Sequence, residues 1–146
     1  MNITVKTFKE LNSMELYSIL QLRAKVFVVE QNCVYQDLDG KDQNALHVIG
    51  TKRDKIVAYT RVFKAGFYYD VASIGRVVVA QEERRYGYGK VIMEASIQAV
   101  KEHLNEETIK ISAQEYLKNF YYDLGFKEVG EGYLEDGIPH IAMIKN

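Results

Sequence analysis

The sequence predicts an α/β domain, because strand-like and helix-like periodicities follow one another along its whole length. Apolar residues alternate with polar ones in some segments and recur every three or four residues in others. The chain has 146 residues, enough to bury a sizeable core and about the length of one domain. We therefore expect a single domain spanning residues 1–146, and no internal repeat or low-complexity segment interrupts it.

In chain order, the pattern predicts a strand, a helix, three strands, a helix, a strand, a helix and two strands. Strands are predicted where β-branched or alternating apolar residues occur, at residues 3–8, 46–51, 56–63, 74–80, 108–113, 127–133 and 138–144. Helices are predicted where apolar residues recur at helical spacing, at about residues 13–30, 87–104 and 116–124.

Local signals mark the ends of several of these elements. Asn12, with Glu15 three residues later, forms a loose capping box for the first helix, and Gly125 closes the last one. Residues 31–44 contain few apolar residues and predict a loop. A turn at residues 135–137 separates the last two strands, which we expect to pair as a hairpin.

Composition argues against several classes of protein. The formal net charge is −1, whereas a nucleic-acid-binding domain shows a clear basic excess. No apolar run approaches the roughly 20 residues that span a bilayer, and the N-terminus lacks the features of a signal peptide. Cys33 is the only cysteine, so no intramolecular disulfide can form. We expect a soluble cytoplasmic protein with no nucleic-acid and no membrane partner.

The segment Arg84–Lys90 (Arg-Arg-Tyr-Gly-Tyr-Gly-Lys) joins a predicted buried strand to a predicted helix. Two glycines at a helix N-terminus leave backbone N–H groups free beside the positive end of the helix dipole, which suits a phosphate group. Arg84, Arg85 and Lys90 crowd this end, where cations are unfavourable unless an anion is bound. The alternative is a basic turn whose side chains are only solvated.

Two common phosphate-binding loops do not fit this segment. A Walker A motif would need glycine at position 84 and serine or threonine at position 91, where the chain has Arg84 and Val91. A dinucleotide fingerprint starting at Gly87 would need a small residue at position 92, which is Ile92. The remaining pattern, Arg-x-x-Gly-x-Gly, resembles motif A of the GCN5-related N-acetyltransferase (GNAT) superfamily.

This resemblance implies that acetyl-coenzyme A is the cosubstrate. In the superfamily, the loop holds the pyrophosphate of acetyl-coenzyme A, and the matching positions here are Arg84, Arg85, Tyr86, Gly87, Tyr88, Gly89 and Lys90. The strand before the loop pairs its backbone with the pantetheine amides in relatives, which implies this role for Val77, Val78 and Val79. The order of predicted elements is similar to that of the superfamily over nearly the whole chain. The implied fold is a three-layer α/β domain whose mixed, mostly antiparallel central sheet splits where the cofactor inserts.

Two further segments, 23–40 and 136–140, resemble the ElaA-like branch of the superfamily. In that branch, the first helix and the following loop form the acceptor side of the site. The implied reaction is direct transfer of acetyl to a primary amine of a small molecule or peptide, without a metal ion.

The segment Asn119–Phe126 resembles the Tyr-x-x-x-Gly-Phe element of the superfamily. The match implies that Tyr121 protonates the departing thiolate, and a phenol with a pKa of about 10 is protonated at neutral pH. Packing is the alternative in a chain with eleven tyrosines. Gln114 stands where many relatives have an asparagine that contacts the cofactor arm. Asn119 is another candidate for this contact, and either residue could instead belong to the last helix as a cap or surface group.

Two residues are candidates for removing the proton of the amine. Glu30 ends the first helix, where the helix dipole disfavours a carboxylate, which hints at a use; the alternatives are an ion pair with Arg23 or simple solvation. His140 titrates near neutrality and follows the turn shared with the ElaA-like branch. His47 is a weaker candidate, and for both histidines a structural role is the alternative.

The remaining acidic residues and the cysteine are interpreted as taking no part in the chemistry. Asp37, Asp39 and Asp42 form an acidic segment without the glycine position of an EF-hand. This segment could attract a cationic amine, but we expect an ordinary solvated loop. Cys33 has no neighbour in sequence that would lower its pKa, so we interpret it as a small apolar residue. No histidine and cysteine spacing resembles a zinc site, and we expect no metal.

Three other functions stay open at this point. The segment from Arg23 to Glu30 also resembles the start of acyl-homoserine-lactone synthases, which would need a surface that docks an acyl-carrier protein. A non-catalytic coenzyme A sensor would bind the cofactor without turnover, and a purely structural domain would not bind it at all. The motifs identify neither the acceptor nor the oligomeric state, for which a homodimer is one expectation.

Overall fold

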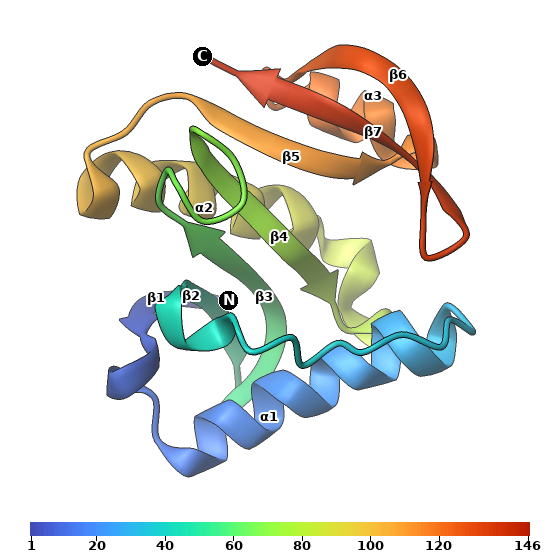
Figure 1. Cartoon of the computed structure of the whole chain (residues 1–146). Coiled ribbons are helices and arrows are strands. Elements are labelled where there is room, and N and C mark those ends of the chain that lie inside the picture. The colour runs from blue at the N-terminus through green and yellow to red at the C-terminus, as the bar shows by residue number, and fades with distance from the viewer.

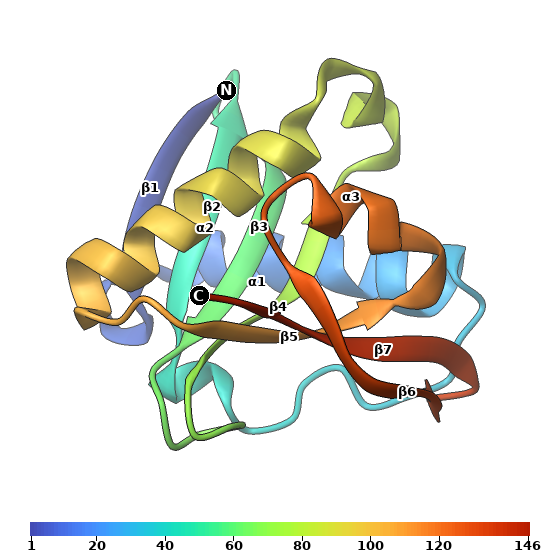
Figure 2. The ribbon, with the colours of Figure 1, turned by 90° about the horizontal axis from the view of Figure 1, so that it is seen from above.

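The computed structural model describes all residues 1–146 and contains one seven-stranded sheet with helices packed on it (Figures 1 and 2). The strands are β1 (Asn2–Thr7), β2 (Leu46–Lys52), β3 (Lys55–Phe63), β4 (Ala72–Val79), β5 (Ile109–Gln114), β6 (Lys127–Glu135) and β7 (Ile138–Lys145). The α-helices are α1 (Ser13–Arg23), α2 (Tyr88–Leu104) and α3 (Lys118–Tyr122). Shorter helical segments are η1 (Phe8–Glu10), η2 (Ala24–Glu30), η3 (Asp42–Asn44), η4 (Gln81–Tyr86) and η5 (Glu115–Leu117).

All predicted strands and helices are present, with ends shifted by a few residues. The first helix differs most, because α1 ends at Arg23 and η2 continues it as a π-helix, with N–H groups bonded five residues back (Gln31 to Val26). The capping box is confirmed: the Glu15 N–H donates to Asn12 Oδ1 at 2.8 Å, and the Asn12 N–H donates to Glu15 Oε1 at 3.0 Å.

The core is built on both faces of the sheet, which makes the predicted three layers. Residues of α2 and α3 pack on one face against a cluster that includes Val48, Ala58, Val62, Ile74, Ile111 and Met143. Residues of α1 and η2 pack on the other face against Ile49, Val57, Tyr59 and Val78. Alternate residues of β2 and β3 therefore serve opposite faces, as the two-residue period of a strand requires.

The sheet is mixed and mostly antiparallel, in the order β1-β2-β3-β4-β5-β7-β6, and only β4 and β5 are parallel. These two strands pair only at Ala72–Ile109 and Ser73–Lys110. Beyond this point they diverge, as Figure 1 shows. The remainder of β4 therefore has a strand partner on one edge only.

A β-bulge bends β4 next to this opening. The register against β3 changes by one residue between Tyr59 and Arg61, and Arg76 adopts a left-handed conformation with φ of 50°. Past the bulge, Ala80 donates its N–H to the Val57 carbonyl of β3. Because backbone groups alternate along a strand, the N–H and C=O groups of Val79 face the opposite edge, where β5 has diverged.

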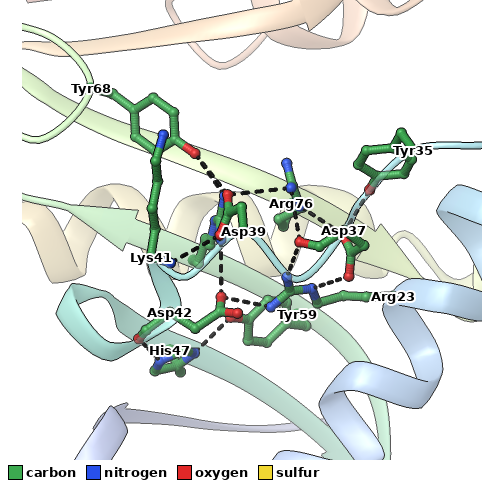
Figure 3. Close-up of polar contacts among 11 residues, drawn as sticks. Arg23, Tyr35, Asp37, Asp39, Lys41, Asp42, His47, Tyr59, Tyr68 and Arg76 are labelled. Atoms are coloured by element: carbon green, nitrogen blue, oxygen red, sulfur yellow. Dashed lines mark hydrogen bonds and ion pairs between the residues drawn. The ribbon is translucent and has the colours of Figure 1, made fainter. Parts of the chain in front are cut away.

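The acidic segment before β2 is not a solvated loop, and this expectation was wrong. Asp37 and Asp42 are buried, and Arg23 at the end of α1 binds both, with nitrogen–oxygen distances of 2.9 and 2.7 Å (Figure 3). Arg61 of β3 binds Asp42 at 3.0 Å and Asp39 at 2.5 Å. The loop is therefore held to the sheet and the helix by ion pairs.

The charges in this cluster are matched and hydrogen-bonded. Burial alone would raise the pKa of Asp42, but the hydrogen bonds and positive charges of Arg23 and Arg61 outweigh it and lower that pKa. Arg61 likewise holds the pKa of Asp39 below its ordinary value against the effect of burial. His47 lies against the same group: Tyr59 Oη is 2.6 Å from its Nδ1, and the Asp42 carbonyl is 2.9 Å from its Nε2. Burial lowers the pKa of His47, so it is a neutral structural residue.

None of the helices combines the length and the apolar character needed to cross a membrane.

We expect Arg23→Ala to lower the free energy of unfolding by about 3–5 kcal/mol, because it leaves two buried carboxylates with less compensation. Lys6→Ala is the matched control, since it removes a partly exposed ion pair with Glu15, and it should cost less than about 1 kcal/mol. Urea unfolding followed by circular dichroism measures both. Equal losses for the two variants would contradict the account of the cluster.

Candidate active site

A cavity of about 620 Å³ lies where β4 and β5 separate. Its walls come from η2 and the loop after it, β4, the start of α2, β5, η5 and α3, and the β6–β7 hairpin. The structure brings most of the predicted site residues to this one cavity: Glu30, Val77, Val78, Val79, Arg84, Gly87, Gly89, Lys90, Gln114, Tyr121 and His140.

Four predicted cofactor-binding residues do not line the cavity with the others. The Arg85 guanidinium donates to the Tyr86 hydroxyl at 2.9 Å and lies over that ring. Tyr86 and Tyr88 contact each other and the Lys52 ammonium, which is 4.1 Å from the Tyr86 ring centre. Asn119 is exposed on α3. In this structure the side chains of Arg85, Tyr86 and Tyr88 lie outside the cavity.

The glycine loop has the geometry of a helix N-terminus with unsatisfied donors. Gly87 has φ of 73°, a conformation that favours glycine, and α2 begins at the next residue. The Val91 N–H makes the first helical bond, to the Gly87 carbonyl at 3.3 Å, and no side chain caps this end. The N–H groups from Gly87 to Lys90 therefore lack helical partners. These donors and the dipole of a 17-residue helix suit a diphosphate.

Arg84 connects this loop to the end of the first helix. Its Nη1 lies 2.5 Å from Glu30 Oε2, and its Nε donates to the Val79 carbonyl at 3.1 Å. The alternative pairing of Glu30 with Arg23 is wrong, because Arg23 is buried with Asp37 and Asp42. Glu30 thus binds the Arg84 guanidinium, which the motif assigns to a phosphate. An incoming phosphate must compete with the Glu30 carboxylate for this guanidinium.

Tyr121 is both packed and directed to the cavity. Its ring lies edge-on to Phe120 and Phe126, with ring centres 5.1 and 6.0 Å away, and only 6% of the residue is exposed. Burial raises the pKa of Tyr121 above its ordinary value, so the phenol is protonated at any physiological pH. Tyr122, the next residue, is 40% exposed and does not line the cavity.

His140 has the geometry of an oriented base. Its Nδ1 lies 2.7 Å from the Ile138 carbonyl, which only accepts hydrogen bonds, so the proton of the neutral ring resides on Nδ1. Its Nε2 lies 3.4 Å from the Glu135 carboxylate, and its ring stacks on Tyr133. The Ser112 hydroxyl contacts the Tyr133 hydroxyl and lies 3.3 Å from Glu135 Oε1. The Nε2 atom therefore faces the cavity side of the hairpin beside a carboxylate.

Sequence reasoning missed several residues of this cavity, above all Glu135, Arg76 and Tyr35. The sequence pattern places Glu135 only in a turn. Arg76 carried a usable signal, because it is a charged residue inside the apolar run 74–80 of a predicted buried strand. Gln114 lies at the end of β5, opposite His140 in the register, with its Nε2 3.5 Å from Gln31 Oε1.

Comparison with known proteins agrees with this geometry. A family model described as an acetyltransferase (GNAT) domain matches residues 13–146. Protein ElaA of Escherichia coli is 43% identical over 138 residues, which cover 93% of this chain and 90% of that protein.

Solved structures give the same result. The crystal structure of an acyl-CoA N-acyltransferase from Pseudomonas aeruginosa matches with a TM-score of 0.94 and 38% identity, covering 100% of both chains. The crystal structure of Escherichia coli ElaA matches with a TM-score of 0.91 and 38% identity, again over 100% of both chains. The chain therefore belongs to the GNAT superfamily of acyltransferases and, within it, to the ElaA-like proteins.

Proposed function

We propose that the protein transfers the acetyl group of acetyl-coenzyme A to a primary amine of a small molecule or peptide. One observation carries this proposal: a single cavity joins the glycine loop at the start of α2, the unpaired edge of β4, the Tyr121 phenol and the oriented His140. The single cysteine suits a reducing compartment, and we expect the protein to act in the cytoplasm.

The cofactor is expected to lie along the opening of the sheet. Its diphosphate would accept hydrogen bonds from the N–H groups between Gly87 and Lys90, with Arg84 and Lys90 supplying positive charge. Its pantetheine arm would follow the edge of β4 from Val77 to Val79, where backbone donors and acceptors have no strand partner. This arrangement would hold the thioester at the bulge.

The reaction forms one C–N bond and breaks one C–S bond. The amine attacks the thioester carbonyl, whose developing negative charge is stabilised by a backbone N–H of the bulge region. Tyr121 donates its proton to the leaving thiolate. His140 takes the proton of the amine at Nε2, which lies next to Glu135. Glu30, which is held in place by Arg84, is the second candidate for the base. Alignment of both reactants in one cavity supplies much of the rate.

A thiol-release assay with acetyl-coenzyme A and a panel of amines tests the proposal. We expect release of free coenzyme A that depends on the amine, together with an acetylated product seen by mass spectrometry. Cofactor binding without turnover on any amine would favour a sensor. Activity only with an acyl-carrier protein as donor would favour a reaction like that of the acyl-homoserine-lactone synthases, and absence of binding would favour a structural domain.

We predict that Tyr121→Phe lowers kcat by roughly 100-fold or more while the Kd for coenzyme A is unchanged, because only the proton donor is lost. Tyr122→Phe is the matched control at the adjacent, exposed position and should retain activity. Steady-state kinetics and calorimetry measure the two quantities. Equal activity of both variants would remove Tyr121 from the chemistry.

We predict that Glu30→Gln tightens coenzyme A binding, because it frees Arg84 from a competing carboxylate. Partly exposed ion pairs contribute at most about 1 kcal/mol, so the Kd should fall by up to roughly fivefold. Glu82→Gln, an exposed position in η4 with the same charge change, should leave the Kd unaltered. If Glu30→Gln retains its kcat, His140 is the residue that takes the proton of the amine. Weaker binding of coenzyme A by this variant would contradict the competition between Glu30 and the cofactor for Arg84.

A further inference from the structure

Arg76 is a cation in the cavity wall that the proposed chemistry does not use. It sits at the bulge of β4 in a left-handed conformation, with φ of 50°, which is unfavourable for a residue with a side chain. Such a conformation persists where surrounding contacts impose it, and it is concentrated at functional sites. The bulge turns the Arg76 side chain toward the acidic loop and the cavity.

The guanidinium is fixed before any ligand arrives. Its Nε donates to Asp37 Oδ1 at 2.8 Å, and its Nη2 donates to the Asp37 carbonyl at 3.1 Å. Nη2 also lies 3.5 Å from Asp39 Oδ2. The Tyr35 ring centre is 5.4 Å from the guanidinium carbon. Asp37 is itself held by Arg23, so the position of Arg76 is set by the buried cluster.

One terminal nitrogen of Arg76 remains available. Nη1 makes no hydrogen bond or ion pair within the protein, and no buried side-chain nitrogen lacks a partner, so Nη1 is open to solvent. Figure 3 shows a terminal nitrogen of Arg76 without a dashed line, pointing away from the loop. The N–H groups of this fixed, charged nitrogen can donate charge-assisted hydrogen bonds to a carboxylate.

The hairpin side of the same cavity carries the opposite charge. The Glu135 carboxylate lies beside His140 Nε2 and is also contacted by the Ser112 hydroxyl. A protonated amine is attracted to this side before it loses its proton to the base. The same cavity must hold both the thioester arm and the reacting part of the acceptor within about 620 Å³.

We propose that the acceptor is a small amino acid, whose carboxylate is bound by Arg76 and whose ammonium group faces Glu135 and His140. This inference rests on the proposed function and names its substrate class. The amine loses its proton to the base and forms the new C–N bond with the acetyl group. The carboxylate of the amino acid takes no part in this step and serves only for binding. The product has no ammonium group, so it loses its attraction to Glu135 and can leave.

The test compares acceptors that differ only in the carboxylate. The standard amino acids are assayed beside the amines that lack the α-carboxylate, such as alanine beside ethylamine and phenylalanine beside 2-phenylethylamine. A site built to bind a group rejects the analogue without it, so we expect kcat/KM to favour at least one amino acid over its amine by about tenfold or more. Equal kcat/KM values within every pair would overturn the inference and leave the proposed function standing.

Arg76 variants connect the preference to this residue. Arg76→Gln should lower kcat/KM for the preferred amino acid by about tenfold or more, with the effect in KM, and change that of the matched amine by less than about twofold. Arg76→Lys keeps the charge but cannot bind Asp37 and present a free nitrogen to the substrate at the same time, so it should retain only part of the preference. A preference unchanged in both variants would overturn the assignment, and thermal unfolding checks that each variant is folded.

A binding measurement separates failure of this inference from failure of the proposed function. Calorimetry titrates the amino acids and the matched amines into the protein saturated with coenzyme A, without turnover. Binding that needs the carboxylate and is lost in Arg76→Gln would support the site even if no amine were acetylated, in which case only the proposed function fails. Absence of amino acid binding together with absence of turnover would overturn both.

Discussion

The parting of β4 and β5 is the constraint on which the rest of the structure depends. Two residue pairs join these strands, and beyond Ser73 this edge of β4 has no neighbouring strand. Backbone donors and acceptors inside a sheet are normally satisfied by the next strand, so an open edge is costly unless water or a ligand pairs with it. The opening also lies beside the glycine loop, whose N–H groups lack helical partners. Both sets of free donors therefore face one cavity.

The acceptor side of the cavity is organised by charge. Residues 31–41 form no regular helix or strand, and the contacts that fix this loop come largely from Arg23, Arg61 and Arg76. Three carboxylates face three guanidinium groups, so burial is offset by ion pairs and hydrogen bonds. The cluster reaches from the end of α1 to the bulge of β4. It thereby couples the stability of the loop to the position of a cavity-lining side chain.

The sequence predicts most of the fold, because local periodicity determines which segments become strands and helices. The Asn12 cap and the Arg-x-x-Gly-x-Gly loop were also predictable, since their signals lie within a few residues of each other. The acidic cluster was not, because Asp37 and Arg76 are brought together by sheet register and a bulge. For Asn119 the sequence left a cofactor contact and a surface position on the last helix open, and the structure exposes it on α3.

Hydrogen exchange measured by mass spectrometry, with and without coenzyme A, tests the central claim most directly. If the ligand completes the opened sheet, exchange should slow in peptides that cover residues 77–79 and 87–90 and stay unchanged in β1 and β2. Binding of coenzyme A that leaves both segments exchanging at their original rates, or no binding at all, would contradict the account.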